Sequence, residues 1–217
     1  YAGTGKTSLV GALVKALVGL KQKVVLMAPT GRAAKVFSSY ADFPAFTIHK
    51  QIYREKRFGA EVQSFDLNPN LYRDTIFIVD EASMIANQGL AGVSFGSGCL
   101  LDDLVRYVYI YENCKLILMG DTAQLPPVGE ELSPALIPDH LVGYGLSVHQ
   151  FELTDVVRQN EESGILYNAT RLRDALVRDD IYHLPEIRLK GLRGLAYLSG
   201  TNLLEALSAS YSPYGMA

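Results

Sequence analysis

The first eight residues of the chain, YAGTGKTS, contain most of a glycine-rich phosphate-binding loop. The full pattern is G-x-x-x-x-G-K-[ST]: backbone N–H groups surround the phosphates, the lysine reaches the β and γ oxygens, and the hydroxyl binds Mg²⁺. Gly5, Lys6 and Thr7 occupy its last three places, and the opening glycine would precede Tyr1. We therefore expect the first strand of the fold to be missing from this chain. The expected nucleotide-binding residues are Gly3, Thr4, Gly5, Lys6, Thr7 and Ser8.

Composition favours a soluble globular protein with a sizeable core. Of the 217 residues, 48% are hydrophobic and 20% are charged, which excludes a disordered chain. The longest apolar stretch, Leu9 to Leu20, is interrupted by Lys15 and is too short to span a bilayer. We expect no membrane partner and a cytoplasmic, nucleoid-associated location. Because the net charge is −3, any nucleic-acid-binding surface must be a local patch.

Apolar runs and helical periodicities alternate along the chain. A helix is expected from Thr7 to Leu20, because its apolar residues recur at helical spacing. Short apolar runs predict buried strands; they lie at Val24–Met27, Ile76–Val79, Leu116–Met119 and near Val148–Leu153. Alternation of this kind predicts an α/β fold, with a parallel sheet covered by helices on both faces.

The predicted organisation is an ATPase domain at residues 1–178, followed at 179–217 by a linker and the start of a second domain. Residues 53–68 alternate polar and apolar side chains around a glycine and predict an inserted β-hairpin. Residues 87–98 contain repeated glycines and predict a flexible surface loop. Cys99 and Cys114 form no metal-binding pattern with histidines and are expected to be reduced, buried and inert.

Polar residues follow the predicted strands, at the edge of the sheet where α/β proteins bind ligands. Lys6 with the Asp80-Glu81 pair favours nucleoside triphosphate hydrolysis, with ATP and Mg²⁺ as the expected ligands. In this interpretation Lys6 neutralises the β and γ phosphates, and Thr7 ligates Mg²⁺ directly. Asp80 holds the ion through water. Glu81 orients or deprotonates the attacking water.

Several segments, in order, resemble the RecD-like branch of superfamily 1 DNA helicases. They are AGTGKTS at 2–8, APTGRAAK at 28–35, TIHK at 47–50, VDEASM at 79–84, GDTAQLPPV at 120–128 and LTDVVRQ at 153–159. The resemblance covers nearly the whole chain and implies the first RecA-like motor domain of such an enzyme, with 5′ to 3′ polarity. It implies that Gln124 senses the γ-phosphate and couples it to DNA, and that Arg158 contacts the γ-phosphate as a charge stabiliser.

The same resemblance implies single-stranded DNA, or its junction with a duplex, as the partner. Thr30, Gly31 and Arg32 stand at a helix start, where N–H groups can receive a phosphate. Thr47 and His49 would contact the DNA backbone similarly, although a histidine packed into its local turn is the alternative. The hairpin would be the pin that splits the duplex, or an element charged for solubility. Its candidate residues are Arg54, Lys56, Arg57 and Phe58, the last of which could stack on a base or pack on a neighbour.

Three functions remain open from the sequence. The first is the motor domain of an ATP-dependent DNA helicase, which could belong to a larger repair or recombination complex. The second is the helicase-like portion of a conjugative relaxase, whose additional nuclease domain would carry a histidine cluster. The third is a nucleotide-dependent DNA-binding module without turnover. In every case we expect the 217-residue chain alone to bind nucleotide weakly and to unwind little or nothing.

Overall fold

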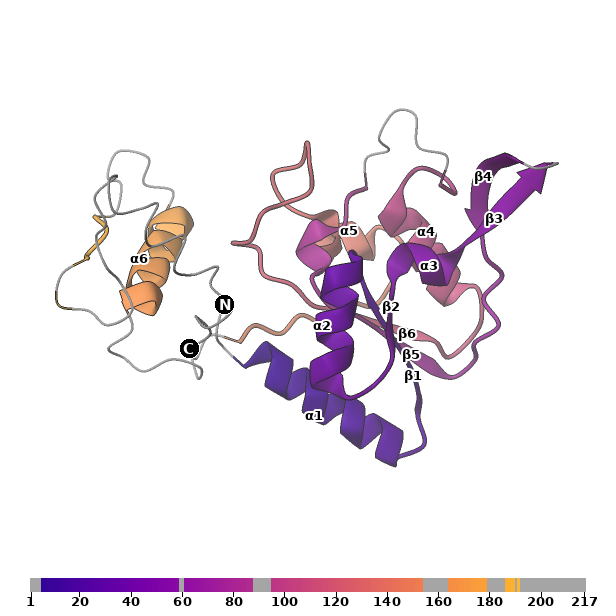
Figure 1. Ribbon diagram of the computed structural model, residues 1–217, viewed down its shortest axis with the longest axis horizontal. Helices are drawn as coiled ribbons and strands as arrows, with labels where there is room; N and C mark the ends of the chain where they lie inside the picture. The colour runs from indigo at the N-terminus through magenta and orange to yellow at the C-terminus, as the bar shows by residue number, and fades with distance from the viewer. Residues whose placement is uncertain are drawn as a thin grey trace, which may run out of the picture. The chain divides into compact units, whose positions relative to one another are not determined.

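A computed structural model describes residues 5–58, 61–87, 95–153, 164–178, 186–189 and 191 of the chain (Figure 1). The chain divides into two compact units, Tyr1–Val157 and Arg158–Ala217. The first unit contains the sheet and every candidate site residue that the structure describes. The second contains one described helix, α6 (Gly164–Arg178). No helix in the described part of the chain is long and apolar enough to cross a membrane.

The first unit is built on a four-stranded sheet in the order β2-β1-β5-β6. Its strands are β1 (Lys23–Ala28), β2 (Ala45–Thr47), β5 (Thr75–Val79) and β6 (Lys115–Leu118). Each neighbouring pair is parallel, with Leu26 opposite Ile78 and Ile78 opposite Ile117. Three of the four predicted strands are therefore confirmed, since continuous apolar runs are typical of parallel strands buried on both faces.

Two helices, α1 (Lys6–Gly19) and α2 (Gly31–Ala41), cover one face of this sheet. Val10 and Val14 of α1 and Phe37 of α2 pack with Leu26 and Ile78 in one buried cluster. The valines are one helical turn apart, so they lie on the same side of α1. These helices carry the candidate phosphate loop and the Thr30–Arg32 segment at their starts.

The opposite face is covered by α3 (Ile48–Ile52) and α4 (Leu100–Tyr109). Ile48, Ile52 and Leu104 are fully buried there and pack with Phe77 and Val79 of β5. The predicted α/β fold with helices on both faces is thus confirmed. Three short helical segments complete the unit: η1 (Ala82–Met84), η2 (Pro134–Leu136) and α5 (Pro138–Val142).

The predicted hairpin is present as β3 (Tyr53–Phe58) and β4 (Glu61–Leu67), which form a separate antiparallel pair. Arg54 lies opposite Asp66, and the register shifts between Lys56 and Arg57. Figure 1 shows this hairpin projecting from the sheet beside α3 and α4. The insertion therefore adds a two-stranded arm without interrupting the parallel sheet.

Residues 88–94 of the glycine-rich segment 87–98 lie outside the described part, so the predicted flexible loop stays a prediction, while both ends of the segment are attached to neighbouring elements. Phe95 stacks on Phe65 of the hairpin with ring centroids 4.3 Å apart, and the Gly96 N–H donates to the Phe65 carbonyl at 2.7 Å. Asn87, before the undescribed 88–94, is bonded to Asp102 of α4. Phe95 buries apolar area against the hairpin and so attaches this end of the segment to β4.

The strands differ from the prediction in two places. The strand predicted near Val148–Leu153 does not form: residues 146–153 have no regular structure, and Phe151 is 91% exposed. The polar residues between its apolar positions leave the run without a buried face, so it joins no sheet. β2, a strand of only three residues, was not predicted from the sequence.

The helix α6 belongs to the second compact unit, which begins at Arg158. The sequence placed it inside a domain ending at residue 178. Asn168, buried in this unit, donates to the Gly164 and Arg188 carbonyls at 2.8 Å each. Residues 192–217 lie outside the described part, so the linker and the start of a second RecA-like domain predicted at 179–217 stay a prediction.

Candidate nucleotide site

The start of α1 places Gly5 and Lys6, from the described end of the candidate phosphate loop, at the carboxyl edge of the sheet. Gly5 precedes the helix with φ of 80°, a left-handed conformation that glycine adopts without a steric penalty. Its carbonyl accepts the first helical bond, from the Leu9 N–H at 2.9 Å. Lys6 and Ser8 are therefore in the first turn of α1, with Ser8 exposed. A helix start of this kind presents N–H groups to an anion.

The Lys6 side chain reaches across to the end of β6. Its Nζ donates to the Gly120 carbonyl at 3.2 Å and lies 3.9 Å from Oδ2 of Asp121. The Asp121 side chain is 4% exposed, whereas that of Lys6 is 28% exposed. The ammonium therefore stays accessible to a ligand, while its carboxylate partner is held inside the protein.

Asp80 follows β5 directly and is oriented by three hydrogen bonds. Its N–H donates to the Met27 carbonyl of β1 at 3.0 Å. Its Oδ1 accepts the Glu81 N–H at 2.9 Å, and its Oδ2 accepts the Tyr40 hydroxyl at 2.5 Å. The carboxylate is thus fixed at the sheet edge, and each oxygen retains a lone pair for a further donor.

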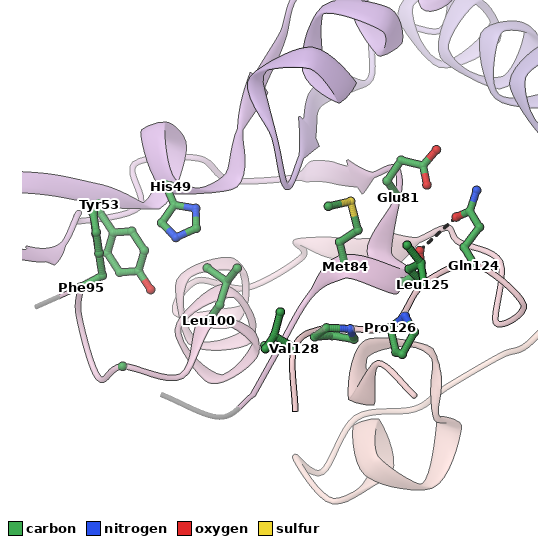
Figure 2. Close-up of a pocket in the computed structure, with 14 residues that line it drawn as sticks. His49, Tyr53, Glu81, Met84, Phe95, Leu100, Gln124, Leu125, Pro126 and Val128 are labelled. Carbon is green, nitrogen blue, oxygen red and sulfur yellow. Dashed lines mark hydrogen bonds between the residues drawn. The ribbon is translucent and has the colours of Figure 1, made fainter. Parts of the chain in front are cut away.

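Glu81 has the strained backbone and shifted titration typical of a functional carboxylate. Its φ is 55°, a left-handed value that is uncommon outside glycine. Burial raises the pKa of Glu81, and the Asp80 and Asp121 carboxylates raise it further, while Lys6 and a hydrogen bond with Gln124 lower it. The Ser83 hydroxyl donates to Gln124 Oε1 at 3.1 Å (Figure 2). Gln124 therefore connects the loop after β6 to the candidate base.

The donors at this edge fit a divalent cation of the magnesium type. Asp80, Glu81 and Asp121 are carboxylates, the hard oxygen donors that Mg²⁺ prefers. The described residues contain no cluster of three or more His, Cys, Asp or Glu side chains arranged to hold a metal by themselves. A nucleotide-bound Mg²⁺ needs none, since it takes one or two carboxylates together with phosphate oxygens.

Two predicted DNA-contacting threonines cap helices. Thr30 Oγ1 accepts the Ala33 N–H of α2 at 3.2 Å, and Thr47 Oγ1 accepts the Lys50 N–H of α3 at 3.1 Å. These caps use the hydroxyl lone pairs locally. At α2, the N–H groups of Gly31 and Arg32 stand at the exposed first turn, where intrahelical partners are absent.

His49 packs among aromatic rings instead of standing free. Its ring centroid lies 5.2 Å from that of Phe95 and 5.6 Å from that of Tyr53. Burial lowers the pKa of His49, which favours the neutral imidazole at neutral pH. The ring thus packs against a ring from a distant segment as well as one near its own turn, and it lines a cavity; its contact with DNA stays a prediction.

That cavity runs from the base of the hairpin to the loop after β6 and has a volume of about 790 Å³. Figure 2 shows His49, Tyr53 and Phe95 at one end, and Glu81 and Gln124 at the other. Between them the lining is mostly apolar and includes Met84, Leu100 and Pro126. Leu125 and Val128 at its margin are each 87% exposed. We call this cavity the apolar groove.

Several predicted site residues lie outside what the structure describes. Gly3, Thr4 and Arg158 are outside the described residues. The backbones of Thr7, Lys56, Arg57 and Phe58 are described, in α1 and β3, but their side chains are not. Arg54 is exposed at the start of β3. The structure therefore brings together Lys6, Asp80, Glu81 and Gln124, and leaves the roles of the others as predictions.

Two residues for which the sequence predicted no role belong to this constellation. Asp121 faces Lys6, and Tyr40 holds Asp80. Asp121 could have been found, because it follows an apolar strand just as Asp80 does. Tyr40 lies near the end of α2, far from any motif, and only the tertiary fold brings its hydroxyl to the site.

A family model described as an AAA domain matches residues 1–185. The chain belongs to the AAA domain family. This membership agrees with the parallel sheet and with the position of Gly5 and Lys6 at the start of α1. The α/β P-loop NTPase fold predicted from the sequence is thereby confirmed.

Curated relatives of this AAA domain include proteins named as helicases or transfer proteins. The ATP-dependent RecD2 DNA helicase of Deinococcus radiodurans is 29% identical over 170 residues, which cover 77% of this chain and 20% of that protein. The conjugal transfer protein TraA of Rhizobium radiobacter is 32% identical over 161 residues, or 74% of this chain and 12% of that protein. The predicted resemblance to RecD-like helicases is confirmed, and the AAA domain spans a minor part of each relative.

A solved structure, that of Bacteroides Pif1 bound to single-stranded DNA, matches 79% of this chain and 41% of that one. The TM-score is 0.49 and the sequence identity is 23%.

Proposed function

We propose that this AAA domain hydrolyses ATP as the motor of a DNA helicase. The observation that carries the proposal is the convergence of Lys6, Asp80, Glu81 and Gln124 at one edge of the parallel sheet. They come from three separate segments of the chain, Asp80 and Glu81 being neighbours, and Glu81 interacts with the other three. A cation, a metal-binding carboxylate, a base and a γ-phosphate sensor are the parts that phosphoryl transfer to water requires.

In this proposal the side chains at the sheet edge position the reacting groups and neutralise the charge of the phosphates. A divalent cation bound with the nucleotide would neutralise part of the phosphate charge. Lys6 would release the Gly120 carbonyl and Asp121 to contact the β and γ phosphates. Glu81, whose raised pKa makes it a better base than an ordinary carboxylate, would take a proton from the attacking water. Gln124, bonded to Ser83 and Glu81, would respond to the γ-phosphate.

The proposed nucleic-acid partner is single-stranded DNA, or its junction with a duplex. The exposed N–H groups of Gly31 and Arg32 are suited to a phosphate. The apolar groove, with His49 and Phe95 at one end, is suited to bases, which stack on aromatic side chains whatever their sequence. Gln124 and Glu81 line this groove and also belong to the nucleotide site, so these two residues would relay the state of one ligand to the other.

The test of the proposal is ATP hydrolysis by the complete protein that carries this domain, with and without single-stranded DNA. Glu81→Gln should retain nucleotide binding and lower the hydrolysis rate by about 10²- to 10⁴-fold. The matched control is Glu112→Gln, a change at an exposed glutamate, which should hydrolyse ATP like the wild type. Turnover that responds neither to DNA nor to Glu81→Gln would refute the motor.

A second candidate is the helicase-like portion of a conjugative relaxase, because the TraA relative named above aligns with 74% of this chain. A relaxase would nick supercoiled plasmid DNA at a transfer origin. Nicking by the complete protein, retained when Lys6 is replaced, would favour this alternative. The motor proposal expects no nicking.

The finer expectations belong to the same proposal: Mg²⁺ as the cation, 5′ to 3′ polarity, a cytoplasmic, nucleoid-associated location, and membership of a repair or recombination complex. Polarity follows directly from unwinding of duplexes that carry a 5′ or a 3′ single-stranded tail. Only the substrate with the 5′ tail should be unwound.

A further inference from the structure

Tyr40 joins α2 to the candidate metal-binding carboxylate. Its hydroxyl donates to Asp80 Oδ2 at 2.5 Å, the short distance typical of a bond from a hydroxyl to a carboxylate. Because an ionised carboxylate can only accept hydrogen bonds, the Tyr40 hydroxyl is the donor in this contact.

The Tyr40 ring is fixed by its surroundings. It stacks on Phe37, one turn earlier in α2, with ring centroids 5.1 Å apart, and Phe37 is fully buried. The Tyr40 carbonyl lies against Gly11 of α1, where an added Cβ would approach it to 3.0 Å. Since α1 also carries Lys6, Tyr40 contacts the helix of the phosphate loop and the carboxylate after β5 at once.

No catalytic step described above requires a tyrosine at this position. Asp80 Oδ1 already has a backbone donor, the Glu81 N–H at 2.9 Å, which holds only one side of the carboxylate. Without a donor on Oδ2 the group could rotate about its terminal bond, because that torsion has a broad energy minimum. The Tyr40 hydroxyl removes this freedom.

We propose that Tyr40 is a positioning residue for the divalent cation: its hydroxyl holds the Asp80 carboxylate in the orientation in which that carboxylate receives the cation bound with the nucleotide. This inference rests on the proposed ATPase function and concerns the metal-dependent part of nucleotide affinity. Outer partners of metal sites commonly contribute 10- to 100-fold to metal affinity.

The experiment measures binding of a fluorescent ADP analogue to the complete protein, once with Mg²⁺ and once with EDTA. The readout is the ratio of the two affinities, which isolates the contribution of the metal. Tyr40→Phe keeps the ring and its stacking on Phe37 but removes the hydroxyl. It should leave the affinity in EDTA unchanged and lower the Mg²⁺-dependent gain by about ten-fold.

Tyr144→Phe is the matched control, because the Tyr144 hydroxyl also donates to a carboxylate, that of Asp102. It should keep the full Mg²⁺-dependent gain. Asp80→Asn should abolish the Mg²⁺-dependent gain in affinity. It therefore gives the lowest value with which the gain of Tyr40→Phe can be compared. Far-UV circular dichroism and thermal unfolding check that each variant is folded.

The possible outcomes separate the two proposals. If Tyr40→Phe keeps the wild-type gain while Asp80→Asn loses it, the ATPase proposal stands and the role of Tyr40 is refuted. Equal losses of affinity with Mg²⁺ and with EDTA would make Tyr40 a purely structural residue and would also refute its role. If the wild type binds no nucleotide under either condition, the ATPase proposal fails and this inference fails with it.

Discussion

Two buried aspartates show how differently the protein uses the same side chain. Asp121, after β6, is 5% exposed and faces the Lys6 ammonium at 3.9 Å. Asp103, in α4, is 3% exposed and accepts the Tyr53 hydroxyl at 2.7 Å and the Ser97 N–H at 2.9 Å. One aspartate holds a cation that a ligand can reach, and the other joins neutral donors from two elements.

The difference separates a binding region from an anchoring region. The Lys6–Asp121 contact is long and partly exposed. Lys6 can therefore leave Asp121 and contact a phosphate at little cost in free energy. The Asp103 bonds are short and enclosed, and they attach the hairpin base and the 95–98 segment to α4. We therefore expect substitutions near Asp121 to change activity and substitutions near Asp103 to change stability.

The largest effect should come from Lys6→Ala in the binding region. Removing a charge placed to stabilise the transition state typically lowers the rate by about 10²- to 10³-fold. ATP turnover of the complete protein measures the loss. Lys15→Ala, at an exposed position of the same helix, should turn over ATP normally. Near-normal turnover by Lys6→Ala would remove the distinction between the two regions.

Asp103→Ala should have the largest effect on stability. The Tyr53 hydroxyl and the Ser97 N–H would lose their acceptor, at a cost of about 3 kcal/mol in the free energy of unfolding. Chemical denaturation measures this cost. Asp103→Asn keeps an acceptor oxygen and should lose less. Nucleotide affinity of the folded variants should match that of the wild type; a selective loss of that affinity would contradict an anchoring role.

The pH dependence of turnover should sharpen the contrast. A base must be deprotonated, so the raised pKa of Glu81 moves the acid limb of the rate profile above the pH expected for an ordinary glutamate. Gln124→Ala removes a hydrogen bond that lowers this pKa, and should move the midpoint to still higher pH. Gln150→Ala, at an exposed position, should leave the midpoint unchanged. If Gln124→Ala leaves the midpoint of the acid limb unchanged, Glu81 is not the base.

The smallest effect concerns His49 at the hairpin base. Burial lowers its pKa in the folded protein below the ordinary value of 6.5, so the unfolded chain takes up the proton first. Its contribution to stability is present above about pH 6.5 and is lost as the pH falls through the folded-state pKa. His49→Phe should reduce the loss of stability at low pH. This change in the free energy of unfolding should be smaller than the change that Asp103→Ala causes. Denaturation at pH 5 and pH 8 compares the two, with His149→Gln, at an exposed position, as the control.

The parallel sheet was predictable because its strands are short, uninterrupted apolar runs. Val24–Met27 and Ile76–Val79 are buried on both faces, so their sequences carry no alternation and few alternatives fit. The run near Val148 has polar residues between its apolar ones, and the structure leaves Phe151 in solvent. β2 has only three residues, too few for its composition to distinguish a strand from a loop, so it could not be predicted.

The candidate site was predictable where contacts follow from position along a strand or loop. Lys6, Asp80 and Glu81 belong to local patterns whose chemistry is visible in the sequence. Tyr40 and Asp103 act through partners separated from them by 40 and 50 residues, respectively. Such pairs depend on how helices pack against the sheet, and nothing in a single sequence distinguishes them from ordinary surface or core residues.

The two thiols give this molecule a native labelling site. Both are free; Cys114 is buried as the sequence predicts, whereas Cys99 is half-buried, so the prediction of a buried, inert thiol is wrong for its burial. Cys99 stands just before α4, between Gly98 and Leu100, which line the apolar groove. A thiol-reactive dye would therefore attach preferentially at the margin of that groove, and a change in its emission would report whether the proposed DNA partner enters the groove.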